Sequence, residues 1–334
     1  MKDGRKEHDS SEFKPLPLRI PQSITDPIQT YETAIDLARL DDTLGWRMLE
    51  KRARASATSA LISWREEASK TPPLQWDQVP QRIDEAFERL APRIALALVG
   101  VESRKPVFSN QRAVFDELTN IGKWERSGVV SLVELPNTFG YIYQGLHGAL
   151  CLDTEQLDLA LALADLKTSN SYSEGTESLW QIHELIGWPQ ALGGNCTHAW
   201  KYLSARAKQW TWLSEIFGGE QQYRVGLSAY YMALSVHELA AFVAGGNGET
   251  LKSEQQNVRM DVPLSFFEEG EEINRRAVAL LLRNDVERLW VPFGLKRDDI
   301  RRYWPHWTRW CLSWINGVYH YPYVRTFPFG KLFA

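Results

Sequence analysis

Cysteine is scarce in this sequence, and the spacing of the few that occur argues against several classes of protein. The 334 residues include three cysteines, Cys151, Cys196 and Cys311, which lie far apart. The chain has no CxxC pair and no Cys/His spacing of the zinc-finger kind. A disulfide framework or a structural zinc site is therefore not expected, and a reducing cytoplasm is the simplest location.

The N-terminal residues lack the apolar run that a signal peptide needs. Residues 1–22 are instead polar and charged, with three prolines, which predicts an extended or disordered arm. The net charge is -4, so the whole chain has no general attraction for nucleic acid. From Glu271 onward, however, 11 Lys and Arg accompany 6 Asp and Glu, which makes this C-terminal region locally basic.

Strand-like alternation is nearly absent, and Gly128–Leu135 is the best candidate for a strand. Helical periodicity runs through most of the remaining chain. These patterns predict an all-α fold, either a large multi-helix bundle or an irregular helical-repeat-like array, with at most one short strand or hairpin. A Ser/Asn/Gly-rich stretch, Lys167–Glu177, is expected to separate two packed helical halves, residues 23–168 and 176–334.

Two helices near the N-terminus have clear starting signals. Asp26 precedes Pro27, which is the pattern of a capped helix start. A second helix is predicted from Thr43 to Ser69. Its expected buried side comprises Leu44, Met48, Ala55, Leu61, Ile62 and Trp64. Its basic patch, Arg47, Lys51, Arg52 and Arg54, is expected to be a solvated face.

Complete catalytic and cofactor motifs are missing. The sequence contains no HExxH, no Glu-x-x-His of the di-iron kind and no GxSxG. His147 and Cys151 are four residues apart and can share a helical face, but two ligands do not make a metal site. The glycine-rich Gly245–Thr250 lacks the lysine of a phosphate-binding loop. We expect neither a cofactor nor a metal.

One apolar stretch, Val225–Gly246, is long enough to cross a bilayer. It carries Glu238 beside His237, and an acidic residue in a bilayer costs about 2.5 to 3.5 kcal/mol. The stretch is therefore interpreted as the central, buried helix of a bundle, and no membrane partner is expected.

The segment RRYWPHWTRWCLSW, Arg301–Trp314, contains an Arg-x4-His spacing. Arg301 and His306 in this spacing resemble the motif of HEPN-type ribonucleases, which are all-helical proteins. The resemblance covers six residues and implies His306 as a general acid or base and Arg301 as a stabiliser of phosphate charge. The last helix is expected to begin at Arg297 or at Pro305. The start at Pro305 is favoured, which would put Arg301 in the preceding turn.

Aromatic residues offer a second interpretation of the same segment. Tyr303, Trp307, Trp310 and Trp314 are spaced 4, 3 and 4 apart, which forms one helical stripe. Residues 318–334 continue as an aromatic, proline-broken tail that is too apolar to remain in water. The predicted partner-binding residues of this tail are Tyr319, Tyr321, Tyr323, Phe327 and Phe329.

Three functional hypotheses follow. The leading one is a non-enzymatic helical interaction subunit of an intracellular assembly, which binds a protein partner or further copies of itself through its Trp/Tyr-rich C-terminal region. The first alternative is a metal-independent ribonuclease or toxin-type effector that acts as a homodimer through Arg301 and His306. The second is a sequence-tolerant nucleic-acid-binding protein that uses the basic C-terminal third.

Overall fold

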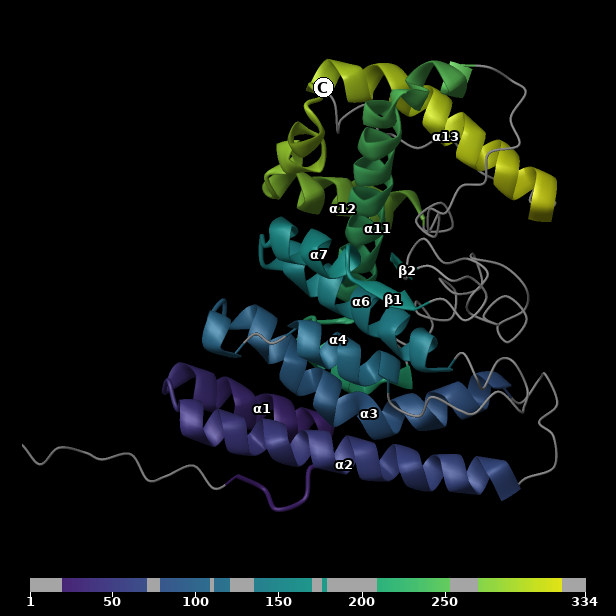
Figure 1. Cartoon of the computed structure of the whole chain (residues 1–334). Coiled ribbons are helices and arrows are strands. Elements are labelled where there is room, and N and C mark those ends of the chain that lie inside the picture. The colour runs from purple at the N-terminus through teal and green to yellow at the C-terminus, as the bar shows by residue number, and fades with distance from the viewer. Residues whose placement is uncertain are drawn as a thin grey trace, which may run out of the picture.

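The fold is a stack of helical layers, seen in a computed structural model of the chain (Figure 1). The structure describes residues 20–70, 79–108, 111–120, 135–169, 176–178, 209–252 and 270–319. The principal helices are α1 (Pro27–Arg39), α2 (Thr43–Lys70), α3 (Val79–Glu102), α4 (Gln111–Asn120), α6 (Leu135–Asp153), α7 (Leu157–Ala164), α10 (Thr211–Ile216), α11 (Glu220–Phe242), α12 (Glu271–Arg283) and α13 (Arg297–Tyr319). The predicted all-α class is confirmed.

The first layer is a helical hairpin of α1 and α2 that packs on α3. The predicted helix start at Asp26 is confirmed, since its carboxylate accepts the backbone N–H of Ile28 at 2.8 Å and of Gln29 at 3.2 Å. This satisfies two donors that the first helical turn leaves without intrahelical partners. The buried side of α2 packs against α1 and α3. Its buried residues are Trp46, Leu49, Ala53, Ala57, Leu61 and Trp64.

Helix α11 runs across the stack and connects its middle to its far end (Figure 1). It packs on α6, where Gly226 lies so close to α6 that an added Cβ would stand 3.1 Å from the carbonyl oxygen of Ala149. Short side chains are required at such an approach because a larger one would push the helices apart. The predicted central helix is thus surrounded by other helices, with 15 of its residues buried.

Length and composition alone would also allow this helical stretch to cross a membrane. Among the described residues, Glu220–Leu251 is the one stretch that passes this test, and 67% of its most apolar window is buried inside the protein. The central helix of a bundle passes the same test, because neighbours that cover it on all sides allow apolar residues all round it.

A short antiparallel hairpin stands within the predicted linker. β1 (Lys167–Ser169) pairs with β2 (Thr176–Ser178), and Thr168 lies opposite Glu177. The strand expected at Gly128–Leu135 lies outside the described residues except for Leu135, which begins α6.

The last helix corrects one prediction. The expected helix start at Pro305 is wrong, because α13 is continuous from Arg297 to Tyr319 with Pro305 inside it. An interior proline costs roughly 3 kcal/mol. Burial of Tyr303, Trp304 and Trp307 on both sides of it offsets that cost, since a large apolar side chain gains about 1.5 to 3 kcal/mol when buried.

Candidate interaction surface

The Arg-x4-His pair does not share a face of α13. On a continuous helix, residues five apart are separated by about 140°. Arg301 is exposed and His306 is half-buried, and the buried Tyr303, Trp304 and Trp307 lie between and beside them. Within this chain the two side chains therefore do not converge on one reacting group.

The first part of the aromatic stripe is core. Tyr303 and Trp307 are 8% and 1% exposed, so their side chains have almost no surface to offer a partner. The Trp307 indole N–H donates to Ser235 Oγ of α11 at 3.3 Å, and its ring lies 5.8 Å from that of Phe242. The other predicted partner-binding side chains, Trp310, Trp314, Tyr319, Tyr321, Tyr323, Phe327 and Phe329, lie outside the described residues.

The glycine-rich loop also belongs to this packing. It forms a π-helical turn (Val243–Asn247) followed by a 3-10 turn (Gly248–Lys252), and Gly246 has a φ of 83°. The Tyr303 hydroxyl donates to Glu249 Oε1 at 3.0 Å, and a Cβ on Gly248 would come within 2.8 Å of the Tyr303 ring. The loop thus covers an aromatic ring, and its Glu249 carboxylate is engaged by the Tyr303 hydroxyl.

Four of the arginines in the C-terminal region are paired with carboxylates. Arg275 pairs with Glu272 and Arg297 with Glu287, and Arg288 lies 3.0 Å from Asp285. Arg283 reaches Asp153 of α6 at 3.6 Å. A phosphate backbone would have to compete with these internal partners for the same guanidinium groups.

His147 and Cys151 do share a face of α6, as predicted, with the Cys151 sulfur 3.5 Å from His147 Nδ1. Both side chains are fully buried. Burial lowers the pKa of His147 to about 3 and raises the pKa of the Cys151 thiol well above its usual value. A neutral thiol beside a neutral imidazole supplies no nucleophile. Among the described residues, no cluster of three or more His, Cys, Asp or Glu could hold a metal ion.

A shallow pocket of about 210 Å³ lies between α1 and α3. Its lining residues are Ile35, Ala38, Arg39, Val99, Glu102, Ser103 and Lys105. Its polar groups already have partners: Lys105 Nζ donates to the Ala38 carbonyl oxygen at 2.8 Å and to Asp41, and Glu102 accepts the Tyr31 hydroxyl. The pocket therefore has little free hydrogen-bonding capacity for a ligand.

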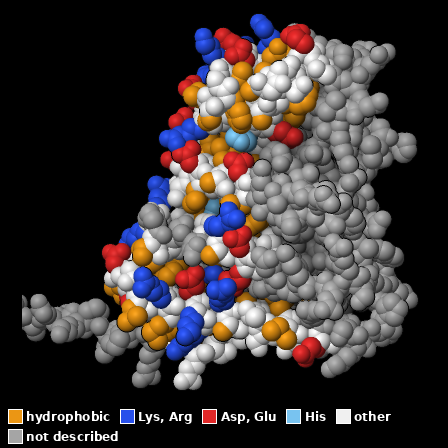
Figure 2. All heavy atoms as spheres, viewed as in Figure 1, with side chains coloured by type: hydrophobic (Ala, Val, Ile, Leu, Met, Phe, Trp, Pro, Cys, Tyr) orange, Lys and Arg blue, Asp and Glu red, His pale blue; other side chains and the backbone are white. Residues whose placement is uncertain are grey.

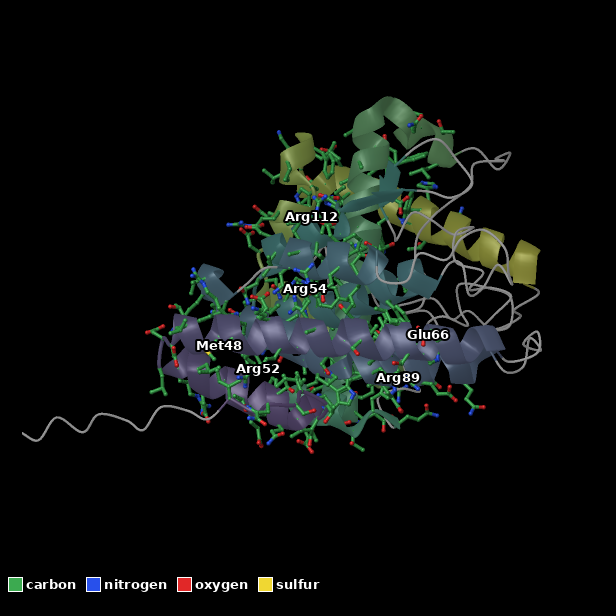
Figure 3. All side chains as sticks on the ribbon, turned by 60° about the horizontal axis from the view of Figure 1, so that its bottom comes forward. Met48, Arg52, Arg54, Glu66, Arg89 and Arg112 are labelled. Carbon is green, nitrogen blue, oxygen red and sulfur yellow. The ribbon has the colours of Figure 1, made fainter. Side chains whose placement is uncertain are left out.

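The outer face of α2 differs from these places, because its apolar side chains are exposed. Leu44 is 69% exposed, Ile62 54% and Met48 43%, and Ala55 is also exposed. Leu40, at the end of α1, extends the apolar surface. Figure 3 looks onto this side of the molecule, with α2 across the front, Met48 near one end and Glu66 near the other. The expectation that Leu44, Met48, Ala55 and Ile62 face the core is wrong.

Cations accompany this apolar line. Arg47, Lys51 and Arg54 are exposed on the same outer side of α2. In Figure 2, hydrophobic side chains and Lys or Arg side chains lie next to one another over the lower part of the molecule, where α1 and α2 are found. We call the exposed residues of Thr43–Ser63 the α2 face; they comprise Thr43, Leu44, Arg47, Met48, Lys51, Arg54, Ala55, Thr58, Ser59, Ile62 and Ser63.

A buried ion-pair network turns Glu50 away from the outer side of α2. Glu50 points inward, with its Oε1 3.4 Å from Nη2 of the buried Arg93 on α3. Arg93 also contacts Glu117 of α4 at 3.1 Å, and Arg54 reaches Glu117 from the surface at 3.6 Å. A buried guanidinium needs such partners, because leaving it unpaired would be costly. The Glu50 carboxylate is therefore paired inside the protein and does not reach the α2 face.

The fourth cation of the predicted basic patch has an internal role. Arg52 is half-buried, and its Nη1 donates to the carbonyl oxygens of Ile20 and Pro21, both at 2.8 Å. By contrast, neither Arg47 nor Lys51 has an ion-pair partner among the described residues. These two cations are available to a binding partner.

Comparison of the chain with protein-family models, with curated proteins and with solved structures finds no match. Sequence reasoning had found the residues of the α2 face but assigned its apolar members to the core. The signal that could have corrected this is the second apolar stripe of the same helix, which contains both of its tryptophans, Trp46 and Trp64.

Proposed function

We propose that this protein is a non-enzymatic helical interaction subunit that joins a larger assembly through the α2 face. The exposed apolar line from Leu44 to Ile62 carries the proposal. Exposing large apolar side chains to water is unfavourable relative to burying them. A partner that buries these side chains gains the free energy of removing them from water.

The chemistry of the other candidate places supports a binding role over catalysis. Arg301 and His306 face apart, and the buried pair His147 and Cys151 is neutral. The aromatic residues of the C-terminal tail remain a predicted second contact region. The proposal keeps the leading sequence hypothesis and moves its main contact surface from the C-terminal end to α2.

Native mass spectrometry of the protein captured from its own host at low salt tests the proposal. We expect a stoichiometric protein partner with the wild type and its loss in a Leu44→Glu/Met48→Glu variant. Both side chains are exposed, so this variant should keep its fold, with a change in stability of about 0.5 kcal/mol or less per site.

A matched control places the same change on another exposed apolar pair. Leu282 and Val291 are 45% and 55% exposed, and Leu282→Glu/Val291→Glu should retain the partner. Loss of the partner in both variants would show that the α2 face has no special role. A homodimer that carries RNA fragments would contradict the proposal and favour the ribonuclease hypothesis.

A further inference from the structure

The spacing of the α2 face is that of a helix that pairs with another helix. Met48, Ala55 and Ile62 are seven residues apart and make one seam position of a heptad repeat apolar throughout. Leu44, Lys51 and Thr58 follow one another at the other seam position, so that position is apolar only at its start. Apolar residues in a heptad repeat allow a second helix to lie alongside because 3.5 residues per turn keep the contact line continuous. The face from Thr43 to Ser63 is about 30 Å long at 1.5 Å per residue. It therefore offers a long, narrow contact to an extended helical partner.

The charge of the α2 face defines the chemistry of that partner. Arg47 and Lys51 are exposed beside the apolar line, and Arg54 shares Glu117 with the buried network. The exposed residues from Thr43 to Ser63 include no acidic residue, and Glu66 is exposed one turn beyond them. Glu50 cannot neutralise Arg47 and Lys51, because it points inward to Arg93. A complementary helix has Asp or Glu on the flanks of its own apolar seam. On the basis of the proposed function, we infer that the α2 face binds an acidic amphipathic helix of a partner protein.

Two other occupants fit less well. A second copy of this chain would present the same cations and no carboxylate between Thr43 and Ser63, so Arg47 and Lys51 would gain no acidic partner there. Like charges at an interface oppose association. An anionic membrane would also meet Glu32 and Asp36, which are exposed on α1 next to α2. A single helix laid along α2 need not approach those carboxylates. The acidic helix is therefore the occupant that the surface favours.

Fluorescence anisotropy with a synthetic probe tests the inference on the full chain. The probe is a labelled peptide of about three heptads with Leu at the two seam positions and Glu at the flanking positions. A matched peptide carries Lys in place of Glu. We expect the acidic peptide to bind at low salt and the basic peptide to remain free.

Two variants separate the two parts of the surface. Arg47→Glu/Lys51→Glu should weaken binding by roughly tenfold at low salt. The difference should shrink in 1 M salt, where the Debye length falls to about 3 Å. Leu44→Glu/Met48→Glu should abolish binding at both salt concentrations, because it removes the apolar contact. The Leu282→Glu/Val291→Glu control should bind as the wild type does.

Several results would overturn the inference. Equal binding of the acidic and basic peptides would show that charge does not select the partner. Wild-type affinity in both α2 variants would show that the peptide binds elsewhere. Binding of the wild type to vesicles of anionic lipid, but not to the acidic peptide, would assign the face to a membrane.

Failure of the inference and failure of the proposed function are distinguishable. If the acidic peptide does not bind, but the partner captured from the host is still lost in Leu44→Glu/Met48→Glu, the interaction role stands and the acidic-helix chemistry is wrong. If neither the peptide nor any captured partner depends on these two residues, both proposals fail.

Discussion

The buried histidine of α6 makes stability depend on pH in a defined direction. His147 is fully buried beside Cys151 and Tyr143, and burial lowers its pKa from 6.5 to about 3. Between these two values the unfolded chain binds a proton at this side chain and the folded chain does not. The contribution of His147 is therefore complete above pH 6.5 and is lost as the pH falls toward 3.

The size of the effect follows from the same values. One pKa unit corresponds to about 1.4 kcal/mol, and pH 5 lies about 1.5 units below the unfolded pKa. We expect the free energy of unfolding to fall by about 2 kcal/mol between pH 7 and pH 5 because of His147. Burial also lowers the pKa of His237, which acts in the same direction. Only the difference between wild type and a His147 variant therefore isolates the effect.

Urea unfolding at pH 7 and pH 5 measures this difference. In His147→Leu the loss between the two pH values should be smaller than in wild type by about 2 kcal/mol. Cys151→Ala is the matched control, because it removes the neighbouring sulfur but keeps the buried imidazole, and it should retain the wild-type loss. An unchanged pH dependence in His147→Leu would refute the reasoning.

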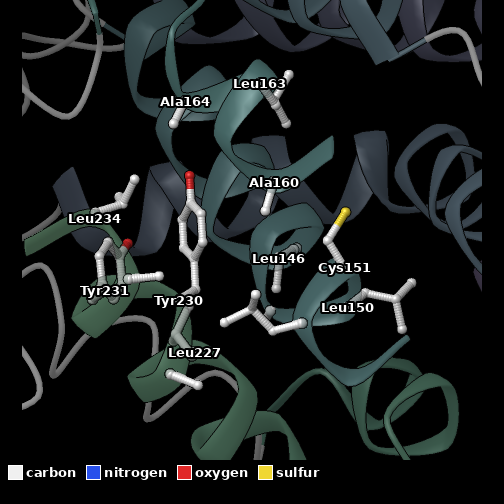
Figure 4. Close-up of a cluster of buried hydrophobic side chains, with 14 of the residues drawn as sticks. Leu146, Leu150, Cys151, Ala160, Leu163, Ala164, Leu227, Tyr230, Tyr231 and Leu234 are labelled. Carbon is white, nitrogen blue, oxygen red and sulfur yellow. The ribbon is translucent and has the colours of Figure 1, made fainter. Parts of the chain in front are cut away.

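Two further predictions concern the cluster around α11 (Figure 4). The buried Tyr230 hydroxyl has no hydrogen-bond partner among the residues that the structure describes, so Tyr230→Phe should raise the free energy of unfolding by about 1 kcal/mol. Tyr143→Phe should lower it, because the Tyr143 hydroxyl donates to Gln111. Urea midpoints that move in the opposite directions would contradict this. Gly148→Ala should destabilise by roughly 1 to 3 kcal/mol, because its Cβ would overlap the Tyr230 ring, and an unchanged midpoint would show that the ring can move aside.

Local signals in the sequence were sufficient for the helical framework. The cap at Asp26 follows from two adjacent residues. In α3, Phe87, Leu90, Ile94 and Leu98 are spaced three or four residues apart, and all four are buried. Such signals work because a capping hydrogen bond and a 3.6-residue period are properties of the helix itself.

Predictions that depend on tertiary packing were wrong. Helix α2 has more than one apolar stripe, and its period does not say which stripe the core takes. The start of α7 gives a related example, because Asp153 and Thr154 are residue types that commonly cap a helix. Thr154 donates to the carbonyl oxygen of Leu150 and so belongs to the end of α6, while Gln156 precedes α7 without a side-chain capping bond.

The candidate site was in part predictable. The cations Arg47, Lys51 and Arg54 were expected at the surface, and they are there. The inward turn of Glu50 could not be foreseen, because it depends on Arg93 and Glu117, which come from two later helices. Without that network, α2 would have been expected to expose Glu50 as well as Glu66.

The route of α11 across the layers has a consequence for synthesis on the ribosome. Helices α1 to α7 are complete by Ala164, but the face of α6 that contacts α11 stays uncovered until α11 ends at Phe242. At about 5 to 20 residues per second, the nascent chain must keep an apolar surface in water for several seconds. The layers synthesised first are thus among the last to be completed. During this interval the uncovered apolar surface of α6 is open to chaperone binding and to aggregation.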